Sequence, residues 1–219
     1  LFRRGILVKS GAALERLAEV DTVVLDKTGV LTEGRPRLID APASIVALAA
    51  PLARASRHPL ARALVETAGC GDVATEVTEV PGMGVEGLID GRRARLGRAA
   101  FVGVDSRHAG ETELWFGFDG DVKVRFAFED AVRDGAARAI ADLKALGLTA
   151  EVVSGDVAGP VERAAAEVGI AHWTSGVTPF DKATRVEQLQ AAGRRVLMVG
   201  DGLNDAAALA KAHASMAPG

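Results

Sequence analysis

The sequence predicts an α/β protein in which a doubly wound parallel sheet is interrupted by an inserted α+β domain with an antiparallel sheet. Residues 23–25 (VVL) form an uninterrupted run of apolar β-formers, typical of a strand buried on both faces of a parallel sheet. After Glu129, strand and helix patterns alternate, as they do in a doubly wound fold. The first strand needs its sheet partners from beyond residue 130, so the β-patterned middle third is an insert.

The boundary of the insert is marked by a change of pattern after the first strand. Residues 11–17 have the spacing of one or two amphipathic helical turns and lead into that strand. Residues 33–36 (EGRP) then form a cluster of helix and strand breakers, where we place the boundary. We expect one discontinuous domain of residues 1–33 and 127–219, and an inserted domain of residues 34–126.

The remaining elements follow from periodicity and turn residues. In the insert, helices are expected at residues 43–54 and 60–67, with Pro59 at a position that can begin the second helix. Strands are expected at residues 75–80, 87–89, 93–96, 113–118 and 122–128. In the rest of the chain, helices are expected at residues 131–146, 161–168 and 184–192, and strands at 150–153 and 195–199.

Composition excludes several classes of function. With 26 basic and 29 acidic residues, a net charge of -3 and no basic block, the chain shows no pattern for binding nucleic acid. Cys70 is the only cysteine, which excludes an internal disulfide and a cysteine-based zinc site, and it fits a reducing compartment. The longest uncharged stretch, residues 41–53, is too short for a membrane span. Because the chain opens without Met, we expect it to be a piece of a longer protein.

Asp26 ends the first predicted strand, and Gly29 allows a sharp turn just after it. Open α/β sheets bind ligands at the carboxyl ends of their strands, so Asp26 lies where a ligand-binding or catalytic residue is expected. Taken alone, the residues Asp26, Lys27 and Thr28 fit either a strand followed by an Asx-type turn or a nucleophilic carboxylate that accepts a phosphoryl group.

Two later segments place further polar residues at comparable points. Ser154 and Asp156 follow the strand at 150–153, where a hydroxyl and backbone N–H groups can hold phosphate oxygens, although a plain turn also fits. Lys182 lies in a segment, PFDK, that precedes a predicted helix, and it is either a solvated surface charge or a group that neutralises a phosphoryl group. These residues can act in one site only if the fold brings their segments together.

The segment GDGLND after the strand at 195–199 carries Asp201, Asn204 and Asp205. Two carboxylates and an amide within this short segment suit a hard cation such as Mg²⁺, which binds carboxylate and phosphate oxygens. The alternative is an Asp-Gly turn with Asp205 in the first turn of a helix, where its charge is favourable.

Together, the motifs DKTGVLT, SGD, PFDK and GDGLNDAAAL resemble those of the P-type ATPases. Two positions depart from the usual pattern: Val30 stands in place of Thr, and Ser154 stands in place of Thr with its hydroxyl retained. The resemblance covers nearly all of the chain. It implies the haloacid-dehalogenase-like phosphotransferase fold, with a phosphorylation domain and an inserted nucleotide-binding domain.

The resemblance also implies roles for the residues of these motifs. ATP would phosphorylate Asp26, with Mg²⁺ held by Asp26, Asp201 and the backbone carbonyl of Thr28. The implied catalytic residues are Asp26, Thr28, Ser154, Asp156, Lys182, Asn204 and Asp205. Phosphatases of this fold carry a second Asp where this chain has Thr28. Because Thr28 does not titrate near neutral pH, the acyl phosphate is expected to persist.

In the insert, SRHPL resembles a motif of the heavy-metal-transporting branch and places His58 before Pro59, at the head of a helix. The segment PGMGVEG contains G-x-G-x-x-G, but a strand and turn follow it, which argues against a dinucleotide fingerprint. The resemblance implies instead that His58, Gly82, Gly84 and Arg98 contact ATP. Many family members carry Glu at the position of Ala53 and Asn at the position of Arg98, so nucleotide binding is expected to be weaker or differently arranged.

The resemblance implies that this chain is the cytosolic ATP-binding region of a heavy-metal P-type ATPase. Its partners would be the protein's own transmembrane and actuator domains, at the cytoplasmic face of a bacterial inner membrane. The transported metal ion would bind elsewhere. Similarity of SRHPLARA and LGRA to the branch linked to haem-copper oxidase assembly favours copper. A soluble phosphatase of the same fold and a non-catalytic nucleotide sensor are the alternatives.

Overall fold

A computed structural model describes residues 7–39, 41–105 and 111–218. The chain divides into two compact units, one of Leu1–Gly34 with Val132–Gly219 and one of Arg35–Ala131. The return to the first unit lies later than the expected position at residue 127, because strand β7 (Val124–Val132) runs on without a break. The connector before residue 7 lies outside the described residues.

The first unit is built on a five-stranded sheet in the order β11-β10-β1-β8-β9, and its strand pairs are all parallel. The strands are β1 (Thr22–Leu25), β8 (Thr149–Val153), β9 (His172–Thr174), β10 (Val196–Val199) and β11 (Ala214–Met216). The chain adds β8 and β9 on one side of β1, then β10 and β11 on the other side. The strand order therefore reverses at β1, and ligands bind at such a switch point in open α/β sheets.

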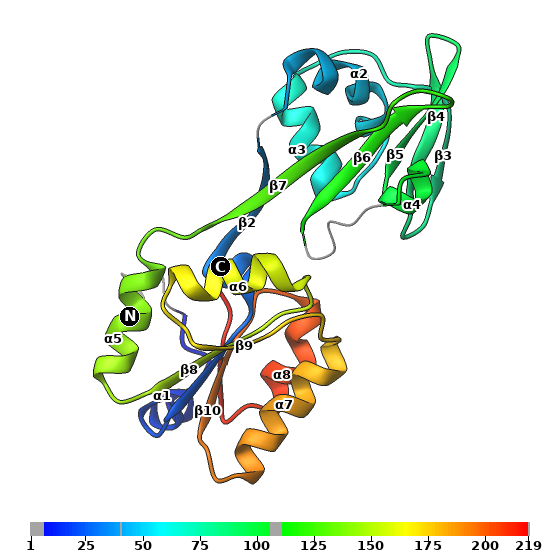
Figure 1. The fold of residues 1–219 in the computed structure, drawn as a ribbon. Helices are drawn as coiled ribbons and strands as arrows, with labels where there is room; N and C mark the ends of the chain where they lie inside the picture. The colour runs from blue at the N-terminus through cyan, green and yellow to red at the C-terminus, as the bar shows by residue number, and fades with distance from the viewer. Residues whose placement is uncertain (1–6, 40, 106–110, 219) are drawn as a thin grey trace. The chain divides into compact units, whose positions relative to one another are not determined.

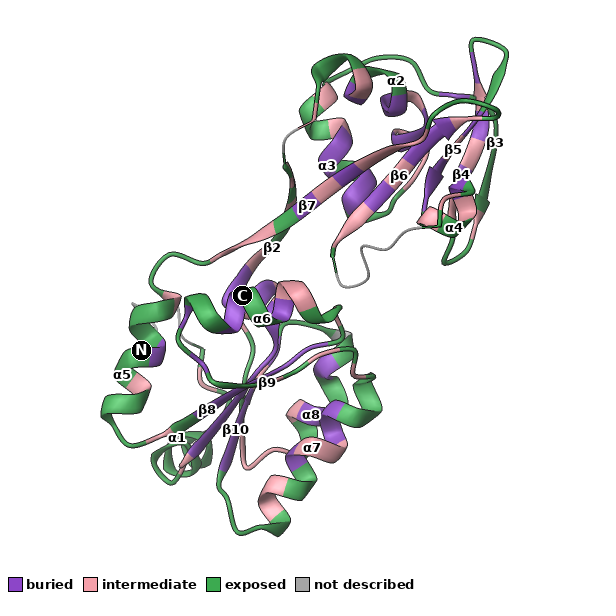
Figure 2. Cartoon of the chain, viewed as in Figure 1, coloured by how far each residue is buried: buried purple, intermediate pink, exposed green. Residues whose placement is uncertain are grey.

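Helices cover both faces of this sheet (Figure 1). They are α5 (Ala136–Ala145), α6 (Ala158–Glu167), α7 (Pro179–Ala191) and α8 (Ala206–Lys211), whereas α1 (Gly11–Ala18) buries none of its residues. Val23 and Leu25 pack with residues of α5 and α6, whereas Val24 packs with residues of α7 and α8. Strand β1 is thus buried on both faces, as its apolar run predicts (Figure 2).

The second unit contains a six-stranded sheet in the order β2-β7-β6-β5-β4-β3, in which β3 to β7 pair antiparallel. Its other strands are β2 (Thr32–Ile39), β3 (Thr75–Val80), β4 (Gly84–Ile89), β5 (Arg92–Gly97) and β6 (Glu113–Phe118), and its helices are α2 (Ala43–Ala53), α3 (Pro59–Ala68) and α4 (Ala99–Val102). Phe126 and Phe128 of β7 pack against Leu52 of α2 and Leu64 of α3 in one hydrophobic core. The expected fold, a parallel sheet in one domain and an antiparallel sheet in an inserted domain, is confirmed.

Helix α7 begins before the expected residue 184 because its start is capped. Thr178 accepts a hydrogen bond from the backbone N–H of Asp181 at 3.2 Å, and the Asp181 carboxylate accepts one from the backbone N–H of Thr178 at 2.9 Å. Pro179 occupies the first turn, where its missing N–H costs nothing. The cap places Lys182 in the first turn of α7. Among the described residues, none of the helices is both long and apolar enough to cross a membrane.

Candidate functional site

The candidate site lies where β1 ends, next to the start of α7 and the segment after β10. Lys182 Nζ donates hydrogen bonds to Asp26 Oδ1 at 2.6 Å and to Asp205 Oδ1 at 2.7 Å. The three residues are almost completely shielded from solvent, with 6%, 5% and 1% of Asp26, Lys182 and Asp205 exposed. Buried charges are stable only when they are paired, so this trio forms one electrostatic unit.

Asp205 is held by both of its carboxylate oxygens. Oδ1 binds Lys182, and Oδ2 accepts a hydrogen bond from the backbone N–H of Asp201 at 3.2 Å. Gly200 is required beside it, because a Cβ at residue 200 would lie 2.5 Å from Asp205 Oδ2. Asp205 therefore orients both Lys182 and the turn that carries Asp201.

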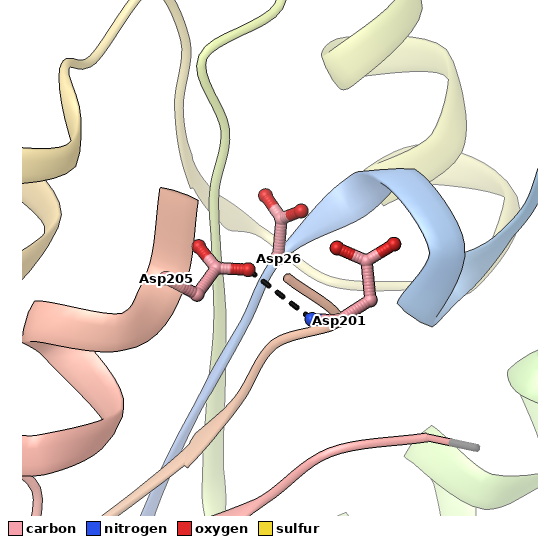
Figure 3. Close-up of side chains that lie close together, drawn as sticks. All are labelled: Asp26, Asp201 and Asp205. Carbon is pink, nitrogen blue, oxygen red and sulfur yellow. Dashed lines mark hydrogen bonds between the residues drawn. The ribbon is translucent and has the colours of Figure 1, made fainter. Parts of the chain in front are cut away.

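Asp201 completes a group of three carboxylates with Asp26 and Asp205, shown as sticks in Figure 3. Each residue offers one oxygen, and these oxygens lie within 4.8 Å of one another. The carboxylate of Asp201 also lies directly against Gly29, where a Cβ would be 1.8 Å from Asp201 Oδ2. The three carboxylates outnumber the Lys182 ammonium, which contacts two of them, and this excess of negative charge and oxygen donors fits a divalent cation such as Mg²⁺.

The buried charges shift the pKa values of Asp26 and Lys182. Burial raises the pKa of the Asp26 carboxyl above its ordinary value; the Lys182 ammonium opposes this shift and the Asp205 carboxylate adds to it. Burial acts to lower the pKa of Lys182, but its hydrogen bonds to Asp205 and Asp26 outweigh burial and raise that pKa. Lys182 is therefore charged at neutral pH.

The loop after β1 is joined to the loop after β8. Asp156 Oδ2 pairs with Lys27 Nζ at 2.6 Å and accepts a hydrogen bond from Thr28 Oγ1 at 3.2 Å. Ser154 is buried, and its Oγ accepts a hydrogen bond from the backbone N–H of Asp156 at 3.2 Å. The structure thus brings Thr28, Ser154 and Asp156 to the strand ends around Asp26. A role for the Thr28 carbonyl as a metal ligand stays a prediction.

Asn204 lies in a short 3₁₀ turn, Leu203–Asp205, and is exposed. Along the chain it lies between Asp201 and Asp205, two of the three clustered aspartates. Its part in the site stays a prediction.

His58 lies in the second unit and caps α3. Its Nδ1 accepts a hydrogen bond from the backbone N–H of Leu60 at 3.3 Å, so we assign the proton of the neutral ring to Nε2. The side chain is exposed. The ring is held in place by this cap, and contact of His58 with ATP stays a prediction.

Gly82, Gly84 and Arg98 lie near one another. Gly82 has a φ of +72°, which suits a turn, and Gly84 packs against Gly97, where a Cβ on Gly84 would be 2.7 Å from the Gly97 Cα. The backbone N–H of Arg98 donates to the Met83 carbonyl at 2.8 Å. Gly84 is thus required by the pairing of β4 with β5, and a further role in approaching ATP stays a prediction.

Ala53 is fully buried in the hydrophobic core of the second unit. A glutamate placed there without other changes would bury a carboxylate among apolar side chains. The absence of Glu at this position therefore agrees with the local packing of this chain.

Comparison with known proteins decides the family. Over residues 20–213 the chain matches the haloacid dehalogenase-like hydrolases. The chain belongs to this family. It is 47% identical over 227 residues to the nitrogen fixation protein FixI of Rhizobium leguminosarum bv. viciae, a match that covers 100% of this chain and 30% of that protein. It is 37% identical over 234 residues to a copper-exporting P-type ATPase of Mycobacterium tuberculosis, covering 98% of this chain and 31% of that protein.

Solved structures place this haloacid dehalogenase-like chain beside heavy-metal P-type ATPases. The catalytic domain of the CPx-ATPase CopB-B superposes with a TM-score of 0.84 at 30% identity, covering 99% of this chain and 85% of that chain. The expected resemblance to the heavy-metal P-type ATPases, and the expected fold, are confirmed. The chain spans about 30% of the length of the curated relatives described above.

Sequence reasoning missed two residues of this haloacid dehalogenase-like site. Lys27 pairs with Asp156, and Arg133 binds carbonyl groups of the loop that follows Asp26. The sequence does indicate a partner for Lys27, because this lysine directly follows a buried strand and a buried lysine needs an anionic partner. Arg133 lies about a hundred residues from its partners in the sequence, and no local pattern predicts the contact.

Proposed function

We propose that this chain is the ATP-binding and phosphorylated region of a heavy-metal-transporting P-type ATPase, in which Asp26 accepts the terminal phosphoryl group of ATP. The observation that carries the proposal is the trio of Asp26, Lys182 and Asp205, buried at the switch point of the sheet beside Asp201. A buried nucleophilic carboxylate with a fixed lysine and nearby cation ligands suits the transfer of a charged group.

The proposed reaction is an in-line displacement. A carboxylate oxygen of Asp26 forms a bond to the γ-phosphorus, the bond from that phosphorus to the β–γ bridging oxygen breaks, and ADP leaves with the bonding electrons. Lys182 holds Asp26 in place and stabilises the negative charge of the transferred group. Mg²⁺, when bound by Asp26 and Asp201, supplies further positive charge to the phosphate oxygens.

The surroundings of Thr28 favour a transport cycle over a phosphatase. The Thr28 hydroxyl donates to Asp156 and carries no titratable proton near neutral pH. The position therefore lacks the carboxyl group that would protonate a leaving group and then activate water. We expect the acyl phosphate on Asp26 to persist long enough to drive a later step.

We further propose that ATP binds the second unit through His58, Gly82, Gly84 and Arg98. His58 and Arg98 are both exposed and both carry side-chain N–H donors, which supports this assignment. The name of the Mycobacterium tuberculosis relative, a copper-exporting P-type ATPase, favours copper as the cargo of the whole protein. Its transmembrane and actuator domains would be the partners, at the cytoplasmic face of the membrane.

Labelling with ATP carrying a radioactive γ-phosphate tests the proposal. The chain is expected to take up label that hydroxylamine removes, and Asp26→Asn is expected to abolish it. The matched control is Asp142→Asn, because Asp142 is exposed on α5. Absence of label would favour a nucleotide sensor, and rapid spontaneous loss of label would favour a phosphatase.

A further inference from the structure

One residue, Arg133, binds three carbonyl groups of the segment that follows Asp26. Its backbone N–H donates to Leu31 O at 2.8 Å, its Nε donates to Thr32 O at 3.0 Å, and its Nη2 donates to Gly29 O at 2.9 Å. The chain leaves the first unit at Gly34 and returns at Val132. The three hydrogen bonds therefore join the outgoing segment to the returning segment within the first unit.

The loop Lys27–Leu31 needs such a partner because it is not a regular helix. Thr28 has φ -74° and ψ 126°, and Gly29 has φ 74° and ψ -10°, so the backbone kinks between them. A kinked segment cannot satisfy all of its carbonyl groups internally. The planar guanidinium group can donate to two carbonyl groups at once with fixed geometry, which a lysine cannot do.

The same loop also lies directly against Asp201, one of the three clustered aspartates. Gly29 lies so close to Asp201 that a Cβ would be 1.8 Å from Asp201 Oδ2, while the Gly29 carbonyl is held by Arg133. Thr28, one residue earlier, is fixed by its hydrogen bond to Asp156. Gly29 is thus in contact with both Arg133 and Asp201.

We infer that Arg133 is a positioning residue for phosphoryl transfer. It fixes the Thr28–Gly29 segment against Asp201 and so sets the spacing of the carboxylate oxygens that receive Mg²⁺ and the phosphoryl group. The inference rests on the proposed function for the reaction that this positioning serves. Small displacements of reacting groups cost large factors in rate, about 100-fold for a misplacement of about 1 Å.

A purely structural role would give a different result. Arg133 is largely exposed, so removing it is expected to leave the cores of both units in place. If Arg133 only stabilised the fold, Arg133→Ala would lower the folded fraction but leave the magnesium dependence of the folded chain unchanged. If it positions the loop, that dependence shifts.

The test measures the initial rate of hydroxylamine-sensitive labelling from γ-labelled ATP across a series of Mg²⁺ concentrations. Arg133→Ala is expected to raise the Mg²⁺ concentration for half-maximal labelling several-fold and to lower the maximal rate by about 100-fold. ATP affinity, measured by calorimetry, is expected to stay within about twofold, because the proposed nucleotide contacts lie on the second unit. Arg138→Ala is the matched control, since Arg138 is exposed on α5.

Arg133→Lys keeps the charge but not the paired donors, so an intermediate rate is expected. An unchanged rate and unchanged magnesium dependence in Arg133→Ala would overturn the inference. If Arg133→Ala does not fold, the labelling rate of Arg133→Lys decides. Labelling of Arg133→Lys at the rate of the unsubstituted chain would then overturn the inference.

Hydrogen exchange separates this inference from the proposed function. Peptides covering residues 27–33 are expected to exchange faster in Arg133→Ala, while β10 exchanges as before. If the unsubstituted chain takes up no label, the proposed function fails, and the exchange measurement still decides whether Arg133 fixes the loop. Unchanged exchange in residues 27–33 would then overturn the inference.

Discussion

Replacement of Lys182 by methionine removes the only cation that contacts both Asp26 and Asp205 among the described residues. The carboxylate oxygens of the site lie within 4.8 Å of one another, and two like charges at this separation repel by about 3 kcal/mol at an effective dielectric constant of about 20. Removal of one partner of a buried ion pair lowers the free energy of unfolding by a similar amount, about 3–5 kcal/mol. We therefore expect Lys182→Met to lower the free energy of unfolding of the first unit by about 3 kcal/mol at about pH 7.

The loss is expected to shrink as the pH falls. Burial already raises the pKa of Asp26, and loss of the Lys182 ammonium raises it further. An Asp whose pKa is higher in the folded state carries a penalty that grows as the pH rises from the unfolded pKa to the folded pKa, and the penalty disappears as the pH falls and the carboxyl is protonated. The difference in unfolding free energy between variant and unsubstituted chain is therefore expected to be smaller at about pH 5 than at about pH 7.

Urea unfolding measures this difference, with EDTA present so that no divalent cation replaces the lysine charge. The chain has two tryptophans, Trp115 in the second unit and Trp173 in the first. A Trp115→Phe background makes fluorescence report on the first unit alone. Lys9→Met, at an exposed position, is the control. A difference below about 1 kcal/mol at both pH values, or one that does not change with pH, would refute the reasoning.

Three further predictions follow from local geometry. Thr178→Ala removes the cap of α7 and is expected to lower the free energy of unfolding in urea by about 1 kcal/mol. Hydrogen bonds to Thr178 lower the pKa of Asp181. The stability that these bonds give is therefore present at neutral pH and is lost as the pH falls through that lowered pKa. Gly29→Ala forces a Cβ against Asp201 and is expected to lower the rate of phosphorylation by about 100-fold with ATP affinity unchanged. His58→Ala removes an exposed donor and the cap of α3, and is expected to weaken ATP binding about tenfold in calorimetry.

Each of these predictions has an outcome that contradicts it. Thr178→Ala with unfolding curves like those of the unsubstituted chain at every pH would show that the cap contributes nothing. Labelling of Gly29→Ala at an unchanged rate would mean that the loop and Asp201 do not need their close contact. Unchanged ATP affinity in His58→Ala would remove His58 from the nucleotide site.

The sequence predicts the buried central strand and the residues at its end because both have strong local signals. An apolar run ending in Asp26, and a second ending in the segment that carries Asp201 and Asp205, place carboxylates at neighbouring strand ends once the sheet is parallel. The contact of Lys182 with both Asp26 and Asp205 follows from the same topology, because α7 leads into β10, beside β1.

Other features were less accessible from the sequence. Strands β9 and β11 have three residues each, too few for an alternating pattern to be recognised. The early start of α7 could have been found, since Thr178 and Asp181 have the spacing of a capping box. The contacts of Arg133 depend on a return of the chain after a whole inserted unit, which residue patterns do not encode.

The central claim is that the side chain of Asp26 becomes phosphorylated by ATP, and chemical trapping tests it most directly. Borohydride reduces an aspartyl phosphate to homoserine, and peptide mass spectrometry then locates the changed residue. The account predicts homoserine at position 26 after incubation with ATP and Mg²⁺, and none in Lys182→Met incubated in parallel. Phosphate found on another residue, with Asp26 unchanged, would contradict the account.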